Sequence, residues 1–316
     1  MINTITKVPL GGFPQKIHVL GTRPENPLLL FLHGGPGITN RHSVIKKQAD
    51  LCDAFTIVAW DQRGNGGSYR GLDPKTLTVD RLVEDARELV EYLCAAYHKQ
   101  KLFICGGSWG TELGTLLAYR YPEHIAAYVG SGQVVNGVEN ETLSYQFSLE
   151  QAEAAGDNKS VAVLKKYGPP VKGQYKNGFE GLMAQRRIMK KYGGHSTKKG
   201  GYFSTMVLPM ICSGEYTPAD LYGIIKGYKL VLSAMWPILT DYDFPTQCNT
   251  FKMPYYIFQG RLDRNTPSAL VQGFYDRITA PDKDLVWFEH SAHGPLGEEP
   301  EKFKALLREK LLKIAA

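Results

Sequence analysis

The sequence predicts an α/β fold, in which a mostly parallel β-sheet has helices on both faces and carries an inserted helical cap. Apolar segments of strand length alternate with segments of helical periodicity over residues 27–130, and the alternation returns over residues 255–314. A strand–helix–strand order produces parallel sheets, because a parallel connection needs a crossover that is usually a helix. Between these stretches the chain reads almost entirely as helix. We therefore expect a core of residues 1–132 and 250–316, interrupted by a cap of residues 133–249.

The strands are predicted from short apolar runs that end at turn residues. The first two runs flank Gly-Gly-Phe-Pro at residues 11–14 and read as a hairpin. Residues 27–32 are apolar without alternation, as expected for a strand covered on both faces of a parallel sheet. In chain order, strands are expected at residues 5–10, 16–20, 27–32, 54–60, 101–105, 124–130, 255–259 and 285–289.

The helices are predicted from apolar residues that recur every three to four positions. The clearest case is residues 78–97, where Thr78 or Asp80 is expected to be the N-cap. Turns such as Gly-Pro-Pro at residues 168–170 separate the helices of the cap. Core helices are expected at residues 41–51, 78–97, 111–121, 268–277 and 299–314, and cap helices at residues 139–155, 160–167, 179–192 and 219–235.

The composition is that of an ordinary globular protein. Of 316 residues, 43% are hydrophobic and 22% are charged, so the core is large enough to need no disulfide or metal. The five cysteines are scattered and form no Cys-x-x-Cys pair, which favours reduced thiols in a cytoplasmic protein. We see no signal peptide in residues 1–8, and no apolar run is long enough to cross a bilayer.

The net charge of +6 is unevenly distributed along the chain. Lysine and arginine crowd the part of the cap between residues 159 and 199. No nucleic-acid-binding motif accompanies them, so we interpret the charge as a solvated helix face, with mild steering of anionic substrates as the second interpretation. We predict no metal, cofactor, nucleic acid or membrane partner. The expected partner is a small-molecule or short-peptide substrate, and the oligomeric state is left open.

The chemistry is expected to centre on Gly-Gly-Ser-Trp-Gly at residues 106–110. Gly-x-Ser-x-Gly between a strand and a helix is typical of a nucleophile elbow, a turn so tight that the serine takes strained backbone angles. Such a turn needs nearly side-chain-free positions two residues before and after the serine, where this chain has Gly106 and Gly110. The motif therefore predicts that Ser108 is a nucleophile. It also directs the backbone N–H of Trp109 to the point where negative charge develops.

A serine nucleophile needs a base that takes its proton and an acid that orients the base. In this arrangement both follow the serine, first Asp or Glu and then His, each on a loop after a late strand. Residues 255–259 lead to Asp263, and residues 285–289 lead to His290 and His293. We assign Asp263 as the acid and His293 as the base, because His293 lies further into its loop than His290 does.

Two backbone N–H groups are needed to bind the oxyanion that forms on the substrate. Trp109 supplies one of them. The loop after the strand at residues 27–32 is expected to supply the other, and in its His-Gly-Gly-Pro-Gly sequence we choose Gly35. Asp61 and Arg63 follow the next strand, and we expect them to pair with each other and with the loop backbone under the site.

Three motifs together resemble the proline iminopeptidase (prolyl aminopeptidase) branch of the α/β-hydrolase superfamily. They are His-Gly-Gly-Pro-Gly at residues 33–37, Asp-Gln-Arg-Gly at residues 61–64 and the serine motif at residues 106–110. The segment 260–267 and Ser-Ala-His at residues 291–293 match the later motifs of that branch. The resemblance covers the core nearly end to end.

The resemblance implies an α/β-hydrolase fold with a helical cap that closes the pocket. It implies that Ser108, Asp263 and His293 form a catalytic triad. It also implies that Gly35 and Trp109 donate to the oxyanion. No cofactor is implied.

A cap glutamate holds the terminal amine of the substrate in some aminopeptidases of this branch, within an Asn-Glu-Phe-Thr-like segment. The matching position here is Glu215, in Gly-Glu-Tyr-Thr at residues 214–217. Those members have a second glutamate directly after the triad aspartate, where this chain has Arg264. A cation there would repel an amine unless the side chain points elsewhere.

Three functions stay open on the sequence alone. The resemblance favours a serine hydrolase that removes an N-terminal residue, typically proline, from short peptides. A small-molecule esterase or amidase of the same fold is the second, and a binding protein that uses the fold without catalysis is the third. The complete triad argues against the third. An epoxide hydrolase or dehalogenase would need an acidic nucleophile in place of Ser108, and a nicotinamide enzyme would need Gly-x-Gly-x-x-Gly after the first parallel strand.

Overall fold

The computed structural model describes residues 1–198 and 207–315 of the chain. Each strand that the sequence predicts is present in it. The strands are β1 (Ile2–Leu10), β2 (Phe13–Gly21), β3 (Leu28–Leu32), β4 (Thr56–Trp60), β5 (Leu102–Gly107), β6 (Ile125–Ser131), β7 (Tyr255–Gly260) and β8 (Lys283–Phe288).

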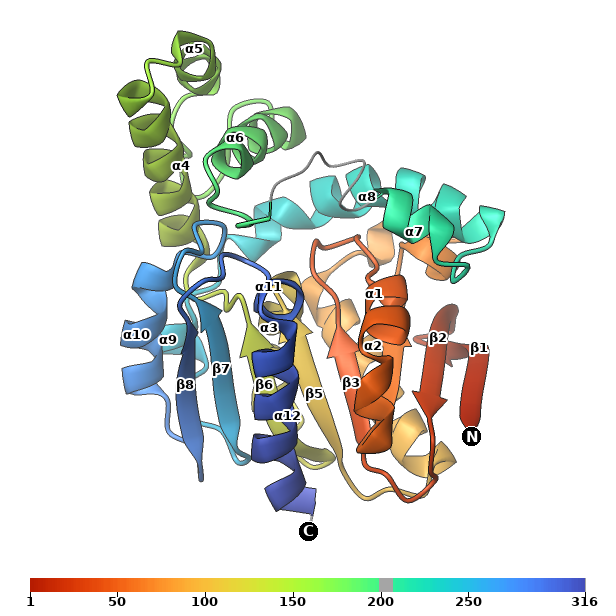
Figure 1. Cartoon of the computed structure of the whole chain (residues 1–316). Helices are drawn as coiled ribbons and strands as arrows, with labels where there is room; N and C mark the ends of the chain where they lie inside the picture. Colours follow the sequence, from red (N-terminus) through yellow and green to blue (C-terminus); the bar gives the residue numbers. More distant parts are fainter. Residues whose placement is uncertain (199–206, 316) are drawn as a thin grey trace.

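Within the described residues these strands form one eight-stranded sheet in the order β1-β2-β4-β3-β5-β6-β7-β8 (Figure 1). β1 pairs antiparallel with β2, and β2 pairs antiparallel with β4. Every other neighbouring pair is parallel. The mostly parallel sheet expected from the alternation of strands and helices is confirmed.

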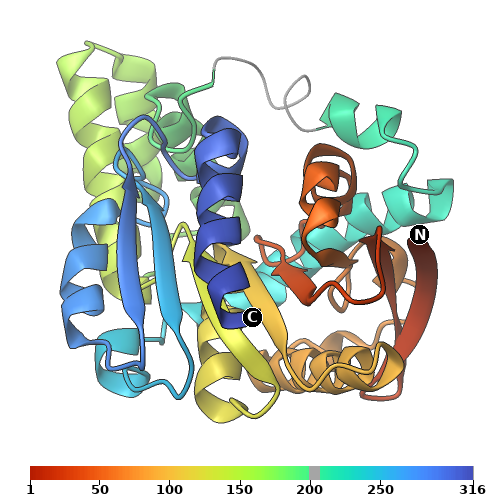
Figure 2. The same cartoon turned by 60° about the horizontal axis from the view of Figure 1, so that its bottom comes forward.

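Helices cover both faces of the sheet, as predicted. On one face, α1 (Arg41–Lys47) and α12 (Pro300–Ala315) pack against one apolar cluster. On the other face, α2 (Val79–Ala96), α3 (Trp109–Arg120) and α10 (Ser268–Arg277) pack against a second cluster. Figure 2 shows α1 and α12 on one side of the sheet and α2 and α3 on the other. Alternate residues of β3 enter the two clusters, which explains why this strand is apolar throughout.

Most of the helices between β6 and β7 gather at one end of the sheet. Figure 1 shows them beyond the carboxyl ends of the parallel strands. All but the shortest of these helices share a small apolar cluster, which includes Tyr145, Leu182 and Leu232. The division into a core and a cap domain, with the cap at residues 133–249, stays a proposal. The helices of this group are α4 (Gly137–Ala154), α5 (Asn158–Tyr167), α6 (Phe179–Lys191), α7 (Leu208–Cys212) and α8 (Pro218–Leu239).

The N-terminal end of α8 is attached to the core by buried charges. Thr217 is its N-cap and forms a capping box with Asp220. The Asp220 carboxylate also lies 2.7 Å from Lys16 Nζ in β2 and 2.8 Å from Arg41 Nη2 in α1. Further along, a Cβ on Gly227 would lie 2.1 Å from a backbone oxygen of the loop after β4. A glycine at that position therefore lets α8 lie directly on the loop.

The structure differs from the predicted elements mainly at helix ends and in short helices. α1 ends at Lys47, and a 3₁₀ turn at Ala49–Asp53 follows, where one longer helix was expected. α8 continues through Pro237 to Leu239, four residues beyond its predicted end. A helix of four or five residues is too short to show apolar periodicity in the sequence. The helices missed for this reason are α7, α9 (Phe244–Gln247) and α11 (Pro295–Glu298).

Candidate active site

Ser108 lies in a strained turn between β5 and α3. Its backbone angles are φ +55° and ψ −124°, a region that residues with side chains rarely occupy. A Cβ on Gly106 would lie 2.3 Å from Gly110 O, and a Cβ on Gly110 would lie 2.1 Å from Leu32 O. Neither contact is sterically allowed, so both glycines are needed for this turn. The backbone therefore has the form that the sequence motif predicts.

Asp263 and His293 come together at neighbouring strand ends, Asp263 after β7 and His293 after β8. Asp263 Oδ2 lies 2.9 Å from His293 Nδ1. The carboxylate is fully buried and accepts hydrogen bonds from Thr266 Oγ1 at 2.7 Å and from Asn265 N at 2.8 Å. Burial by itself raises the pKa of Asp263, but the facing His293 and the hydrogen bonds from Thr266 bring that pKa below its ordinary value. Asp263 is therefore ionised beside the ring.

The other ring nitrogen of His293 meets Asn265, a residue that the sequence analysis did not single out. His293 Nε2 lies 2.9 Å from Asn265 Nδ2. Because Nδ1 faces a carboxylate it carries the ring proton, and Nε2 keeps a lone pair that the Asn265 amide satisfies. Nε2 is the nitrogen that would accept a proton from a serine nucleophile. Asn265 therefore occupies the position that such a serine needs.

Ser108 and His293 both lie next to the end of β6. Ser108 N donates to Ser131 O at 3.0 Å. A Cβ on the next residue, Gly132, would lie 3.0 Å from the His293 ring. Among the described residues no hydrogen bond joins Ser108 Oγ to His293 Nε2. The structure thus brings Asp263 and His293 into contact, whereas Ser108 and His293 are connected only through neighbouring residues at the end of β6.

Two further histidines lie near this loop. The competing candidate His290 is exposed, and its backbone N–H donates to Glu299 Oε2 at 3.2 Å. His195, after α6, accepts a hydrogen bond from His293 N at its carbonyl at 3.2 Å, and the two ring centroids are 5.1 Å apart. Burial, followed by the nearby His293, lowers the pKa of His195 to about 3. His195 is therefore a neutral neighbour of His293 at pH 7.

The loop after β3 lies directly against Ser108. A Cβ on Gly34 would lie 3.0 Å from Ser108 Cβ and 3.2 Å from Gly107 O. Gly35 has φ +118°, a conformation that only glycine adopts readily, and Trp109 begins α3. Both predicted oxyanion donors, Gly35 N–H and Trp109 N–H, therefore belong to backbone segments next to the serine.

The expected pair between Asp61 and Arg63 is wrong. Arg63 Nε lies 2.6 Å from Asp85 Oδ2 in α2. Asp61 accepts a hydrogen bond from Thr39 Oγ1 at 2.5 Å and lies 3.5 Å from Arg41 Nε in α1. α1 and α2 cover opposite faces of the sheet, so the two side chains turn apart and each finds a partner distant in the sequence. Both stay buried and support the loops beneath the site.

The turn between α7 and α8 lies toward the β1–β2 edge of the sheet (Figure 1), and Glu215 is part of this turn. Its carboxylate is buried, 2.8 Å from His18 Nδ1 in β2 and 3.2 Å from Lys46 Nζ in α1. Asp263 and His293 follow β7 and β8, at the opposite edge. The protein itself thus meets the negative charge of Glu215. A role for Glu215 in binding an amine stays a prediction.

Arg264 points toward α4. Its guanidinium carbon lies 5.6 Å from the centroid of the Phe147 ring. Its backbone N–H donates to Gly194 O at 2.9 Å, and its carbonyl accepts a hydrogen bond from Ser144 Oγ. The cation that departs from the aminopeptidase pattern is therefore directed at α4.

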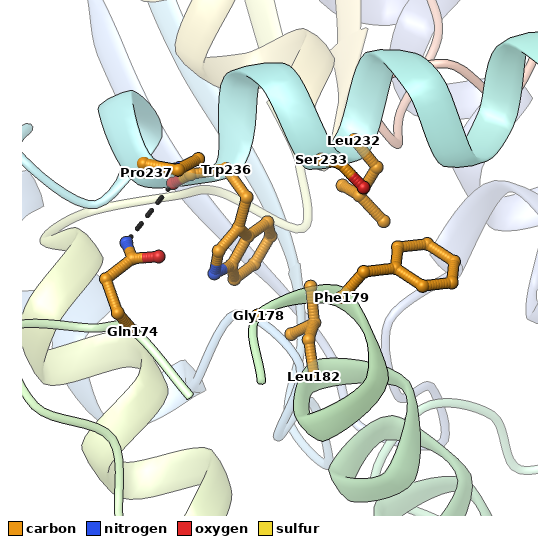
Figure 3. Close-up of a pocket in the computed structure, with 8 residues that line it drawn as sticks. All are labelled: Gln174, Gly178, Phe179, Leu182, Leu232, Ser233, Trp236 and Pro237. Atoms are coloured by element: carbon orange, nitrogen blue, oxygen red, sulfur yellow. Dashed lines mark hydrogen bonds between the residues drawn. The ribbon is translucent and has the colours of Figure 1, made fainter. Parts of the chain in front are cut away.

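A cavity of about 170 Å³ lies between α6 and α8 (Figure 3). Trp236 and Phe179 project into it, and Gln174 Nε2 donates to Trp236 O at 3.4 Å at one end. None of the predicted catalytic residues lines this cavity. The cavity is therefore distinct from the candidate site, which consists of the Asp263–His293 contact and the serine turn.

The part of the chain that the structure describes offers neither a metal site nor a membrane-spanning helix. No group of three or more His, Cys, Asp or Glu side chains there could hold a metal ion. No described helix has the length and apolar character needed to cross a membrane. The five cysteines are all free thiols.

Known proteins share this fold. The family model of the alpha/beta hydrolase fold matches residues 27–167. The chain is 28% identical over 303 residues to the probable aminopeptidase YbaC of Bacillus subtilis. This match covers 96% of this chain and 94% of that protein. It is 25% identical over 322 residues to the proline iminopeptidase of Clostridioides difficile, with 96% of each chain covered. The crystal structure of VinJ matches with a TM-score of 0.67 at 21% identity, over 98% of this chain and 99% of that one. The chain therefore has the α/β-hydrolase fold, and over nearly its whole length it resembles the proline iminopeptidase branch of the proteins with that fold.

Proposed function

We propose that the chain is a serine hydrolase that releases an N-terminal residue, with proline favoured, from short peptides through an acyl-enzyme on Ser108. The observation that carries the proposal is the contact between Asp263 and His293 beside the strained Ser108 turn. A carboxylate on Nδ1 holds the ring in the tautomer that keeps Nε2 basic, which a serine nucleophile requires. The similarity to a probable aminopeptidase and to a proline iminopeptidase supports the substrate class.

The reaction begins when Asn265 leaves His293 Nε2 and the Ser108 hydroxyl takes its place. His293 accepts the serine proton while Ser108 Oγ bonds to the substrate carbonyl carbon and the C=O electron pair moves to oxygen. The N–H groups of Gly35 and Trp109 bind that oxyanion. His293 then gives the proton to the leaving amine as the amide bond breaks. Water repeats both steps on the acyl-enzyme, which releases the residue and restores Ser108.

An aminopeptidase must also accommodate the ammonium of its substrate, because an unpaired buried charge is costly. The proposal keeps Glu215 for this role. Its Oε1 is held by Lys46 Nζ at 3.2 Å, and the Lys46 side chain is 55% exposed. An ion pair with so exposed a partner contributes about 0–1 kcal/mol, so a substrate ammonium could replace Lys46 at little cost.

The alternative function is that of an esterase or amidase for a small acyl substrate without a free amine. Two observations favour it. The Glu215 carboxylate already lies between His18 and Lys46. Arg264 stands where some aminopeptidases have a second glutamate. The two functions share the serine chemistry and differ in what the cap recognises.

The test compares a prolyl-arylamide with its N-acetylated form and with small chromogenic esters, in the wild-type protein and in Glu215→Gln. The aminopeptidase proposal requires a strong preference for the free amine and the loss of that preference in the variant. If both proteins cleave the acetylated amide or the esters equally well, the esterase or amidase is the better description.

Ser108→Ala is the control for the chemistry itself. It should remain folded and lose about 10⁴- to 10⁶-fold in kcat, as expected for a missing nucleophile. A serine mechanism is contradicted if the variant keeps more than about a tenth of the activity. A wild-type protein that turns over none of these substrates would instead fit the non-catalytic alternative.

A further inference from the structure

We propose that Gln62 is a positioning residue that holds the two N–H donors of the oxyanion hole at a fixed separation. The inference rests on the proposed function, because it takes Ser108 as the nucleophile and Gly35 and Trp109 as the donors. Gln62 bonds to the loops that carry the donors and acts through them.

One side-chain amide joins the two backbone segments. Gln62 Nε2 donates to His33 O at 3.1 Å, in the loop after β3. Gln62 Oε1 accepts a hydrogen bond from Trp109 Nε1 at 2.8 Å, at the start of α3. Gln62, His33 and Trp109 are only 1%, 0% and 2% exposed, so solvent does not compete for these bonds. The planar amide therefore ties the two segments together, and neither shifts without breaking a buried hydrogen bond.

His33 carries this constraint to the first donor. Gln62 N donates to His33 Nε2 at 3.2 Å, so Nε2 is the bare nitrogen and the protonated Nδ1 donates to Gly34 O at 2.8 Å. Gly34 O and Gly35 N–H belong to one planar trans peptide and point in opposite directions. Holding the carbonyl toward the His33 ring therefore turns Gly35 N–H to the other side. Burial lowers the pKa of His33 to about 4, so the ring keeps this neutral form at pH 7.

Trp109 carries the constraint to the second donor. Its indole is bonded to Gln62, and its own backbone N–H is the donor. The preceding residue, Ser108, has φ +55°, and strained backbone of this kind persists only where its surroundings hold it. The indole bond is one of the contacts that hold it.

The placement of the donors matters most in the transition state, because the oxyanion forms only there. Removal of a whole donor costs about 10²- to 10³-fold in kcat. Gln62→Met loosens both donors and removes neither. We therefore expect kcat to fall about 10- to 100-fold, with a much smaller change in KM.

The chain offers a matched control in a second buried glutamine–tryptophan pair. Trp60 Nε1 donates to Gln15 Oε1 at 3.1 Å, between β4 and β2, and both residues are at most 1% exposed. Gln15→Met removes the same glutamine–tryptophan bond from an equally buried place away from the donors. Because Gln15 Nε2 has no hydrogen-bond partner among the described residues, whereas Gln62 Nε2 has one, this variant should lower the free energy of unfolding less than Gln62→Met does, and it should leave kcat unchanged.

The experiment measures kcat, KM and urea unfolding for the wild type, Gln62→Met and Gln15→Met. It adds the affinity for a prolyl boronic acid, whose adduct with Ser108 places an oxygen in the oxyanion hole. We expect this affinity to fall in parallel with kcat in Gln62→Met only. With an active wild type, two results overturn the inference. One is an unchanged kcat and boronic acid affinity in Gln62→Met, and the other is an equal loss of both quantities in Gln62→Met and Gln15→Met. An inactive wild type contradicts the proposed function, and the inference with it.

Trp109→Phe removes the same hydrogen bond from the other side and keeps the backbone donor. It makes the inference testable even if Gln62→Met does not fold, since its own kcat should fall by a similar factor. The double variant should lose little more than either single variant, because both changes break one connection. Losses that multiply would show that the two side chains act independently, and would overturn the inference.

Discussion

Asp220 and Asp263 are both buried carboxylates near the end of the sheet that faces the cap, but their partners differ. Asp220 lies between two permanent cations, 2.7 Å from Lys16 Nζ and 2.8 Å from Arg41 Nη2. The partner of Asp263 is the His293 ring, at 2.9 Å. Burial raises the pKa of each carboxyl group, and in each case the partners bring it below its ordinary value. Both carboxylates are therefore ionised, one among fixed charges and one beside a titratable ring.

The two carboxylates therefore have different expected roles at the same end of the sheet. Asp220 attaches α8 to the core, and Asp263 acts in the proposed reaction. Asp220 joins β2, α1 and α8 through its ion pairs with Lys16 and Arg41, so it holds α8 in place. Asp263 fixes one nitrogen of a ring and leaves the other open to a change of partner, from Asn265 in this structure to Ser108 in the proposed reaction. Changes at Asp263 should therefore affect activity, and changes at Asp220 should affect stability.

Asp263→Asn should have the largest effect on activity. The amide would favour the wrong tautomer of His293 and would not stabilise the imidazolium, so kcat should fall about 10⁴-fold while the protein stays folded. Steady-state kinetics and circular dichroism measure the two effects. His293→Ala should lose as much, and His290→Ala, which changes an exposed side chain, is its control. Near-normal activity in Asp263→Asn would move the acid role to another residue.

Asp220→Asn should mainly lower stability. It leaves the buried charges of Lys16 and Arg41 without their common partner, which costs about 3–5 kcal/mol in the free energy of unfolding. The control is Asp50→Asn, since the Asp50 side chain is 47% exposed and its pair with Lys304 should contribute less than about 1 kcal/mol. Urea unfolding measures both variants. If Asp220→Asn kept its stability and lost kcat as far as Asp263→Asn, the proposed contrast would be wrong.

Part of the pH dependence of stability should come from His42, which follows Arg41 in α1. Burial, followed by the charge of Lys47, lowers the pKa of His42 from 6.5 to about 4. As pH falls, His42 takes up a proton in the unfolded chain before it does so in the folded protein. The contribution of neutral His42 to the free energy of unfolding is therefore complete above pH 6.5 and is lost toward pH 4. Between pH 7 and 5 the loss is on the order of 2 kcal/mol. His42→Asn should remove that part of the pH dependence, and identical pH profiles of urea unfolding in both proteins would contradict the assignment.

Asn265→Ala should have the smallest effect, with the opposite sign. Removal of the amide frees His293 Nε2 for Ser108, and one hydrogen bond of this kind contributes about 0.5–1.5 kcal/mol. Labelling of Ser108 by a fluorophosphonate should therefore become about 2- to 10-fold faster. Slower labelling would mean that Asn265 helps to orient the ring and does not compete with the serine.

The candidate site could be predicted in outline because parallel strands place the loops at their carboxyl ends side by side. The chain order of Ser108, Asp263 and His293 then selected three residues, two of which the structure brings into direct contact. Gln62 and Asn265 were missed, although each lies in a segment that the sequence analysis quoted. An amide side chain carries no sign of its role, because the role depends on which atoms face its oxygen and nitrogen after folding.

The sequence by itself determined the alternation of strands and helices and the turn at Ser108, because apolar periodicity and glycine spacing are local properties of the chain. Only the tertiary structure decided the partner of each buried charge. Lys16 and Asp220 are 204 residues apart and form a pair, whereas Asp61 and Arg63 are two residues apart and do not. The energy of a buried charge depends on every group within a few ångströms, and those groups come from elements that meet only when the sheet and its cap assemble.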